Sequence, residues 1–455
     1  MYERLEIIGL RGFSEKGVLN LAQSTGELGS GLTILVGPNN GGKSTIVDAL
    51  RSLGQQGPTS FTEGKRNTMA GTSVNLQLIF GEKKRHLNTV AAGGSETEWI
   101  SKESVGQILA LPSRRYFNPY FSRLDFQRQQ YMQQIGSSNR RGEPINFSGR
   151  LFRILREPQK FNTILEKVLS PAPSWAIEQS DHGQYYLKFQ AGNQYHSSDG
   201  SGEGIISLLF IIDALYDSAT GDVVAIDEPE LSLHPMLQRR LARLLAEFSK
   251  DRQIVYATHS PYFIDFEYVS NGAQIARVVK LESGSKIFEL KKTTAEKLSK
   301  LLTDRNNPHV LGLNAREAFF LEDGIILVEG QEDVLQYPKI LEQLNLEIPA
   351  EFFGWGVGGA DKMETIASLF QDLGFTKLIG LLDGNRDELI GPLQQKFPTY
   401  QFLKIPANDV RTKDAIRQKP AVIGLLDEGG NLREEFRIPL RELFRQANQY
   451  LNMIR

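Results

Sequence analysis

Two series of apolar segments, each alternating with helical patterns, divide this chain. In the first series, "LEIIGLRGF" and "GLTILVG" have the apolar density of strands, and "KSTIVDALRSL" has the spacing of a helix that begins on a glycine turn. Two more buried strands are predicted in "GDVVAIDEPE" and "RQIVYATHSPYFID". We interpret this series as one α/β domain over residues 1–316.

The second series follows a polar stretch around residues 290–320. The predicted strands "GIILVEG", "FFGWGV" and "KLIGLLDG" alternate with the predicted helices "DVLQYPKILEQL" and "METIASLFQDL". Because strands that alternate with helices usually form a parallel sheet, we expect a smaller α/β parallel-sheet domain over residues 317–455.

Composition and charge narrow the class of protein. A chain of 455 residues can bury two or three cores, and its 52 basic and 54 acidic residues nearly balance. The absence of cysteine excludes disulfides, thiolate zinc sites and cysteine nucleophiles. Neither a secretory leader nor an apolar run of about 20 residues is visible. We therefore expect a cytoplasmic protein with no membrane partner.

A glycine-rich loop, "GPNNGGKST", lies between the second predicted strand and the first predicted helix. Its spacing, GxxxxGK[ST] between a strand and a helix, is typical of a phosphate-binding loop. Lys43 can reach the β- and γ-phosphates and the Ser44 hydroxyl can ligate Mg²⁺, so ATP and Mg²⁺ are the expected cofactors. The residues predicted to hold the nucleotide are Gly37, Asn39, Asn40, Gly41, Gly42, Lys43, Ser44 and Thr45.

Two acids and a histidine follow the later strands of the first series. Asp227 is expected in the magnesium shell, and Glu228 is expected to polarise the attacking water. His259 has the spacing of a γ-phosphate sensor. The alternatives are an acidic loop that caps the next helix and a structural histidine.

Acidic residues also end two strands of the second series. Glu329 and Asp383 stand at strand ends, with Asp333 and Asp387 four residues further on. Since ligands bind at the carboxyl ends of parallel strands, these four carboxylates predict a site for Mg²⁺ or Mn²⁺ that can act on a phosphodiester. The alternative is that they are helix caps and solvated turn residues.

The first set of motifs resembles the ABC-type ATPase heads of the SMC and RecF group. The resemblance implies that two heads dimerise around ATP, that Glu228 is the catalytic base and that His259 is the switch histidine. It also implies that Asp227 contacts the nucleotide's magnesium and that Arg11 lies beside the nucleotide, although a surface arginine is an equal alternative. A signature loop that contacts the partner's nucleotide is expected at Ser201, Gly202 and Glu203, where the sequence departs from LSGGE.

The second set, "LVEGQEDV" and "LLDGNRD", resembles the Toprim metal-binding fold. An ATPase head followed by a Toprim domain is the arrangement of the OLD (overcoming lysogenization defect) family. The resemblance implies an ATP-dependent DNA endonuclease in which Glu329, Asp333 and Asp383 hold the metal. It further implies a role in anti-phage defence, as in some retrons, with higher oligomers and a companion protein or a noncoding RNA and reverse transcriptase.

Other functions stay open at this point. Asn385 replaces the second acid of the usual DxD motif, which would weaken metal binding unless Asp387 compensates. An ATPase sensor or scaffold with a degenerate Toprim domain is therefore the first alternative, and a RecF-like DNA repair ATPase is the second. Lys413 is a candidate contact for phosphate charge, with a surface lysine as its alternative.

A basic and aromatic segment over residues 113–160 is the candidate DNA contact in the first domain. It carries nine Arg and one Lys against one Asp and two Glu. The alternative is an insertion whose aromatic residues are core and whose arginines are paired. The residues that carry this interpretation are Arg114, Arg115, Tyr116, Phe117, Tyr120, Phe121 and Arg123.

Overall fold

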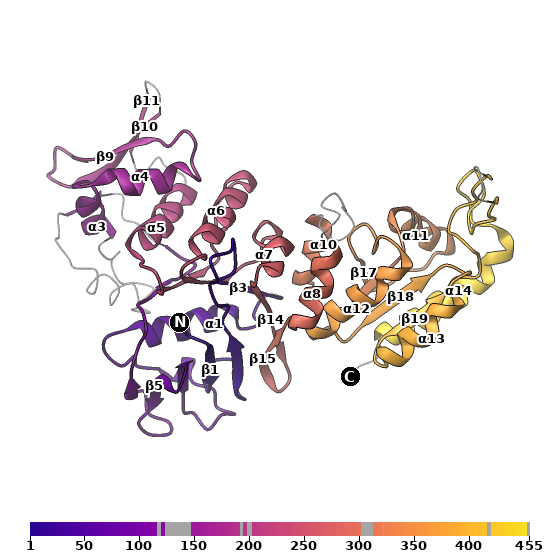
Figure 1. Cartoon of the computed structure of the whole chain (residues 1–455), viewed down its shortest axis with the longest axis horizontal. Coiled ribbons are helices and arrows are strands. Elements are labelled where there is room, and N and C mark those ends of the chain that lie inside the picture. The colour runs from indigo at the N-terminus through magenta and orange to yellow at the C-terminus, as the bar shows by residue number, and fades with distance from the viewer. Residues whose placement is uncertain are drawn as a thin grey trace. The chain divides into compact units, whose positions relative to one another are not determined.

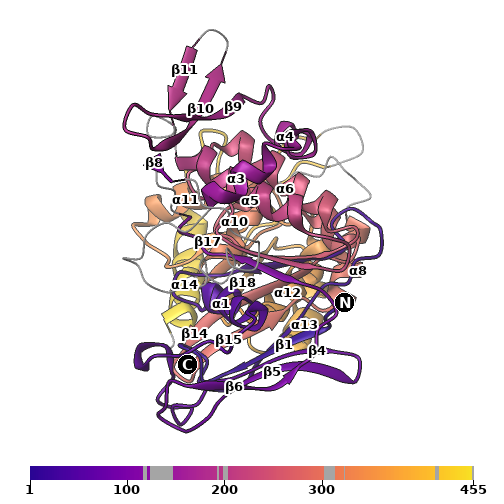
Figure 2. The same cartoon turned by 90° about the vertical axis from the view of Figure 1, so that its left-hand side faces the viewer.

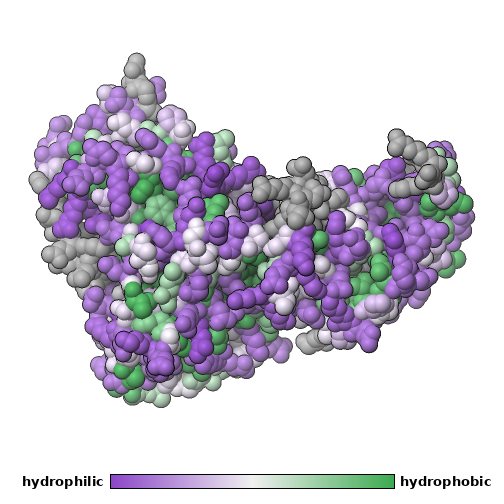
Figure 3. Space-filling model, in the orientation of Figure 1, coloured by the Kyte–Doolittle hydropathy of each residue, from purple (hydrophilic) through white to green (hydrophobic). Residues whose placement is uncertain are grey.

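The chain forms two compact units, Met1–Ile287 and Phe288–Arg455 (Figure 1). The computed structural model describes residues 1–115, 120–122, 147–191, 194–197, 203–301, 313–321, 323–415 and 420–452. Hydrophilic side chains cover most of the face drawn in Figure 3, with scattered apolar patches between them. None of the helices in these ranges is long and apolar enough to cross a bilayer.

A six-stranded sheet lies at the centre of the first unit, in the order β15-β14-β3-β13-β12-β7. The five strands from β14 to β7 in this order pair in parallel. Every residue of β3, β12 and β13 is buried, which explains their continuous apolar runs. The strands are β3 (Leu32–Val36), β7 (Ile108–Leu111), β12 (Val223–Asp227), β13 (Gln253–Ala257), β14 (Gln274–Leu281) and β15 (Gly284–Glu289).

Helix α1 (Lys43–Gly54) lies between this sheet and an antiparallel sheet of order β2-β1-β4-β5-β6 (Figures 1 and 2). Its apolar face buries Ile46 and Leu50 in a core shared with both sheets. At the end of α1, the Arg85 guanidinium of β5 donates hydrogen bonds to the carbonyls of Leu53 and Gln55. The antiparallel strands are β1 (Arg4–Ile8), β2 (Gly17–Asn20), β4 (Asn75–Phe80), β5 (Lys83–Thr89) and β6 (Thr97–Lys102).

A small third sheet and a group of helices complete the first unit. Strand β10 pairs antiparallel with β8, β9 and β11. Arg150 bridges Asp213 and Asp217, which fixes α3 against α5. The elements are β8 (Tyr120–Phe121), β9 (Ser174–Gln179), β10 (Tyr185–Ala191), β11 (Gln194–Ser197), α3 (Phe147–Ile154), α4 (Pro158–Glu166), α5 (Glu203–Asp217), α6 (Pro235–Phe248), α7 (Phe266–Ser270), and the 3₁₀ helices η1 (Glu63–Lys65) and η2 (Pro261–Phe263).

The second unit is built on a four-stranded parallel sheet of order β17-β16-β18-β19. The expected mixed α/β fold with parallel sheets is thus confirmed. Tyr337 of α11 and Phe444 of α14 pack edge to face in the core beside the sheet. The elements are β16 (Ile325–Leu327), β17 (Glu351–Phe352), β18 (Leu378–Leu382), β19 (Gln401–Lys404), α8 (Lys292–Leu301), α10 (Leu313–Glu317), α11 (Gln331–Leu344), α12 (Met363–Asp372), α13 (Asp387–Lys396), α14 (Glu434–Asn452), η3 (Ala318–Phe320) and η4 (Ala360–Lys362).

The second unit begins ahead of the limit expected at 317, because α8 packs on α12. Thr294 Oγ1 donates a hydrogen bond of 2.5 Å to the Asp372 carboxylate, and Lys297 Nζ lies 3.1 Å from the Glu364 carboxylate. Residues before 317 therefore belong to this compact unit. Where the Toprim-type domain itself starts stays a prediction.

Candidate functional site

The glycine-rich loop joins β3 to α1 through conformations that glycine permits. Gly37 and Gly42 have φ of 121° and 118°, in the left-handed region. A Cβ on Gly41 would lie 2.1 Å from the Val278 carbonyl oxygen. Of the other predicted contacts, Asn39 and Asn40 are exposed in the loop, and Thr45 is buried in the first turn of α1. The loop therefore has the strand–turn–helix setting that the motif requires.

The phosphate-binding lysine and the magnesium-binding pair meet at the start of α1. Lys43 is buried, its Nζ donates to the carbonyls of Gly37 and Pro38 at 2.9 and 2.8 Å, and burial lowers its pKa to about 8. Ser44 Oγ donates to Asp227 Oδ1 at 3.1 Å. Burial raises the pKa of Asp227 to about 6. The two neighbouring oxygens of Ser44 and Asp227 fit the donor set of a nucleotide-bound Mg²⁺.

Glu228 and His259 stand at the ends of the adjacent strands β12 and β13. Glu228 has a φ of 48°, and its amide donates to the Ala257 carbonyl at 2.8 Å. Burial, together with the Lys43 ammonium, lowers the pKa of His259, while the Glu228 carboxylate opposes that shift. The predicted sensor and base therefore share one site with the lysine.

Glu230 is a member of this site that the sequence analysis did not select. Its Oε1 accepts a hydrogen bond of 2.6 Å from the His259 amide, and burial raises its pKa. The acid thus fixes the backbone on which His259 stands. The signal was present in the "DEPE" run, where a third acid follows Asp227 and Glu228.

Arg115 faces the interior of this site, contrary to its interpretation as a DNA contact. Its guanidinium donates to Ser207 Oγ and to the carbonyls of Pro112, Asp227 and Glu228. Burial lowers its pKa to about 10. The alternative of a paired arginine is therefore correct for Arg115.

The rest of the basic and aromatic segment gives a mixed result. Phe121 is buried and its ring lies 6.1 Å from that of Phe152, whereas Tyr120 and Arg114 are exposed. Most of the segment, including Tyr116, Phe117 and Arg123, lies outside the described residues.

The predicted signature loop is described only at its last residue. Glu203 begins α5, and its Oε2 accepts a hydrogen bond of 3.4 Å from Ser232 Oγ. Ser201 and Gly202 lie outside the described residues.

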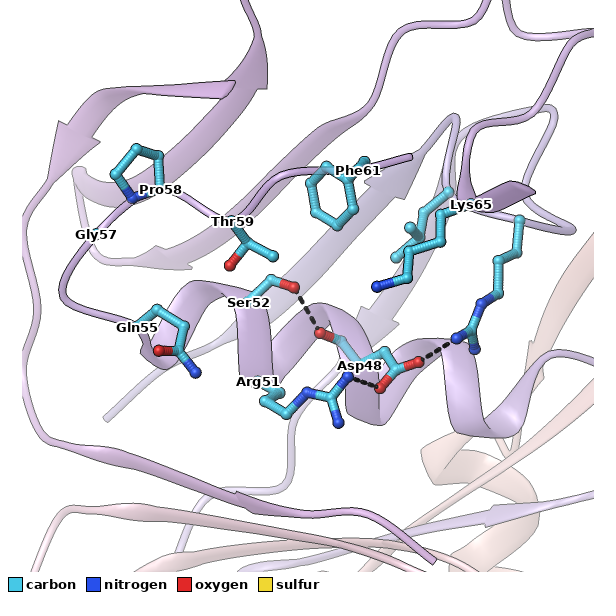
Figure 4. Close-up of a pocket in the computed structure, with 11 residues that line it drawn as sticks. Asp48, Arg51, Ser52, Gln55, Gly57, Pro58, Thr59, Phe61 and Lys65 are labelled. Carbon is cyan, nitrogen blue, oxygen red and sulfur yellow. Dashed lines mark hydrogen bonds and ion pairs between the residues drawn. The ribbon is translucent and has the colours of Figure 1, made fainter. Parts of the chain in front are cut away.

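A cavity of about 380 Å³ opens beside α1 (Figure 4). Arg11 lines it and pairs with Asp48 at 2.7 Å, and Asp48 also pairs with Arg51 at 2.6 Å. The Lys65 side chain extends into the same space, and burial lowers its pKa. Arg11 thus pairs with a residue of α1, and its place beside the nucleotide stays a prediction.

In the second unit, adjacent strands bring two of the predicted acids together. Glu329 follows β16 and Asp383 follows β18, and Glu329 Oε1 accepts a hydrogen bond of 3.0 Å from the Asp383 amide. The Glu329 carbonyl accepts from the amides of Gly358 and Gly359 at 3.0 and 2.8 Å. The amides of the "WGVGG" turn therefore hold the backbone of Glu329.

The acids at these strand ends are close enough to perturb one another. Burial raises the pKa of Asp333 to about 6, and burial with the charges of Glu329 and Asp333 raises that of Asp383 to about 8. Asp409, which the sequence analysis did not select, adds to both shifts. The donors suit a hard divalent cation in kind, but in the described part of the chain no three acid or histidine side chains converge as a ready metal site.

Three further residues of the second unit test the sequence interpretation. The Asp387 side chain is 72% exposed and pairs with Lys404 at 2.6 Å. Contrary to the prediction, it therefore does not join the other acids. Asn385 is exposed in the same turn. Lys413 contacts Asp409 at 2.6 Å and Glu332 at 3.1 Å, which places its ammonium beside the acidic cluster.

Comparison with known proteins finds partial matches to this chain. A family model described as "AAA domain, putative AbiEii toxin, Type IV TA system" matches residues 106–265, and an "AAA domain" model matches residues 4–155. The chain is 34% identical to the OLD nuclease of Thermus scotoductus over 132 residues, and 26% identical to endonuclease GajA of Bacillus cereus over 204 residues. These matches span 28% and 43% of this chain but only 24% and 32% of the relatives.

Solved SMC head domains are also similar to part of the chain. The head from Thermotoga maritima has a TM-score of 0.36 at 18% identity and covers 64% of this chain and 99% of its own. The head from Pyrococcus furiosus, solved with the C-terminal domain of ScpA, has a TM-score of 0.43 at 15% identity and covers 66% of this chain and 99% of its own. Scores below 0.5 do not establish a shared fold.

The motif order, the parallel sheet and the two AAA-domain matches, at residues 4–155 and 106–265, indicate a P-loop ATPase domain in the first unit. The two curated relatives are similar to this chain over less than a third of their own length, so the activity of the whole protein is a matter for proposal.

Proposed function

We propose that this protein hydrolyses ATP in its first unit and cleaves DNA in its second unit with the help of Mg²⁺ or Mn²⁺, as an OLD-type endonuclease. Both similar curated proteins are named as nucleases. Because the matches span under a third of each relative, the activity and the DNA partner are proposals for this chain.

In the first unit, Lys43 and the loop amides would bind the ATP phosphates, and Ser44 with Asp227 would hold the nucleotide's magnesium. Glu228 would orient the attacking water, and His259 would contact the γ-phosphate. Their common location at the ends of β3, β12 and β13 supports these roles. Dimerisation of two heads, with Ser201, Gly202 and Glu203 reaching the partner's nucleotide, is part of this proposal.

In the second unit, the observation that carries the proposal is the hydrogen bond between Glu329 and the Asp383 amide, which brings acids from adjacent strands together. Glu329, Asp333 and Asp383 would hold the cation, which supplies positive charge against a scissile phosphate. Lys413 would add positive charge at the edge of the cluster. A role in antiviral defence, a companion protein or RNA, and a cytoplasmic location remain part of the proposal on family resemblance alone.

A scaffold with an inactive second unit is the competing function. Its support is the exposure of Asn385, the pairing of Asp387 with Lys404, and the lack of a convergent three-ligand group in the described ranges. The two functions differ in whether the acidic cluster is needed for DNA cleavage.

Supercoiled plasmid incubated with Mg²⁺ or Mn²⁺, with and without ATP, separates them. We expect nicking by the wild type, loss of nicking in Glu329→Gln and Asp383→Asn, and nicking within about twofold of wild type in Asp387→Asn, the matched control. Glu228→Gln should abolish ATP hydrolysis. Intact plasmid with wild-type protein that hydrolyses ATP would favour the scaffold.

A further inference from the structure

We infer that Arg115 is a positioning residue that fixes the acidic end of β12 and connects it to α5; this inference rests on the proposed ATPase activity. Its Nε donates to Ser207 Oγ at 2.8 Å, and its Nη1 donates to the Asp227 carbonyl at 2.9 Å. Its Nη2 donates to the Glu228 carbonyl at 2.8 Å. One planar guanidinium thereby joins the backbone carbonyls of the two acids to α5, a helix from an earlier part of the sequence.

The same guanidinium is itself anchored at the strand that precedes it. Nη1 also donates to the Pro112 carbonyl at 2.8 Å, directly after β7. Because β7 and β12 are adjacent parallel strands, Arg115 spans their carboxyl ends. Both strand ends are therefore fixed by one side chain.

The backbone of Glu228 shows why this connection matters for catalysis. With a φ of 48°, Glu228 holds a conformation that side chains other than glycine seldom adopt. Its amide is bonded to the Ala257 carbonyl, and its own carbonyl accepts hydrogen bonds from Arg115 at 2.8 Å and from the Leu231 amide at 3.2 Å. These three bonds fix the peptide units on both sides of Glu228 and so set the direction of its carboxylate, and the Arg115 bond is the one that connects it to α5.

The bond to Ser207 connects this arrangement to the predicted partner head. Ser207 lies on α5 one helical turn after Glu203, the last residue of the predicted signature loop. A shift of the first turn of α5 when a second head binds would move Ser207 and, through Arg115, the carbonyls of Asp227 and Glu228. Arg115 is thus placed to couple head association to the geometry of the water-activating acid.

Substitution by lysine tests the fork geometry while it keeps the charge, because one ammonium cannot reach all four acceptors. We expect Arg115→Lys to lower kcat for ATP at least about tenfold and to change the Kd of a fluorescent ATP analogue less than about threefold. Arg243→Lys, at an arginine of α6 whose side chain is 75% exposed, should leave both values unchanged. Thermal melts identify any variant that has simply unfolded.

Ser207→Ala removes only the connection to α5 and completes a double-mutant cycle. We expect Ser207→Ala to lower kcat several-fold in the wild-type background and to have no further effect in Arg115→Lys. Wild-type kcat in Arg115→Lys, or fully additive effects of the two substitutions, would overturn the inference. A wild-type protein that hydrolyses no ATP would instead overturn the proposed function.

Discussion

Replacing Lys43 by methionine should change how the stability of the nucleotide-free protein depends on pH. Lys43 is only 5% exposed, and burial lowers its pKa from 10.5 to about 8. Below pH 8, both the folded and the unfolded chain hold the proton, so the full cost of burying the ammonium is present. The variant lacks that cost and is expected to melt at a higher temperature than the wild type at pH 7.

The sign of the pH effect follows from proton release. Between pH 8 and 10.5 the folded wild type gives up the proton that the unfolded chain retains, so its stability relative to the variant rises with pH. The slope is about 1.4 kcal/mol per pH unit, or roughly 3 kcal/mol across the window. At about 2 °C per kcal/mol, the gap in Tm should narrow by several degrees.

The assay is a series of thermal melts of wild type and Lys43→Met between pH 7 and pH 10, without nucleotide. Taking the difference between the two proteins cancels the titration of groups that they share. Lys250→Met, at an exposed lysine, is the control, and its gap from wild type should not change over the same range. A constant gap for Lys43→Met would refute the reasoning.

Three other substitutions test separate parts of the structure. Gly41→Ala should abolish binding of a fluorescent ATP analogue, since the new Cβ would lie 2.1 Å from the Val278 carbonyl; retained affinity would contradict that steric argument. Arg11→Ala should raise the Kd for ATP roughly two- to fivefold, because the charge that it removes is partly exposed. An unchanged Kd would place Arg11 outside the nucleotide site. Ile340→Ala should lower the free energy of unfolding of the second unit in urea by about 2–5 kcal/mol, because Ile340 is buried. The control is Leu335→Ala on the same helix, where Leu335 is 48% exposed and the loss should be under about 0.5 kcal/mol. Equal losses would contradict the burial of Ile340.

The sequence predicts best where local pattern and chemistry coincide. The strand, glycine turn and helix around Lys43 were predictable from the sequence, because the motif depends on adjacent residues and on the conformations that glycine permits. The parallel sheet of the second unit was predictable for a similar reason, since its strands and helices alternate along the chain.

Contacts between distant segments were out of reach. Arg115 lies 112 residues before the Asp227 carbonyl that it contacts, and its position in a basic and aromatic run favoured a surface interpretation. Asp409 joins the acidic cluster beyond β19, with no motif to mark it. Asp387 has the expected spacing, but Lys404 of β19 holds its carboxylate in solvent. The start of the second unit likewise depends on the contact between Thr294 and Asp372.

The glycine turn after β17 gives the acidic site a particular response to ionic strength. Glu329 is held at its carbonyl by the amides of Gly358 and Gly359, and at its carboxylate by the Asp383 amide and by an ion pair with Arg386 at 3.6 Å. Dissolved ions screen exposed pairs such as Asp387 with Lys404 far more than hydrogen bonds to backbone amides. Added salt should therefore weaken the pair of Glu329 with Arg386, the exposed pairs at the periphery and the proposed binding of a polyanion, while the three amide hydrogen bonds keep Glu329 in place.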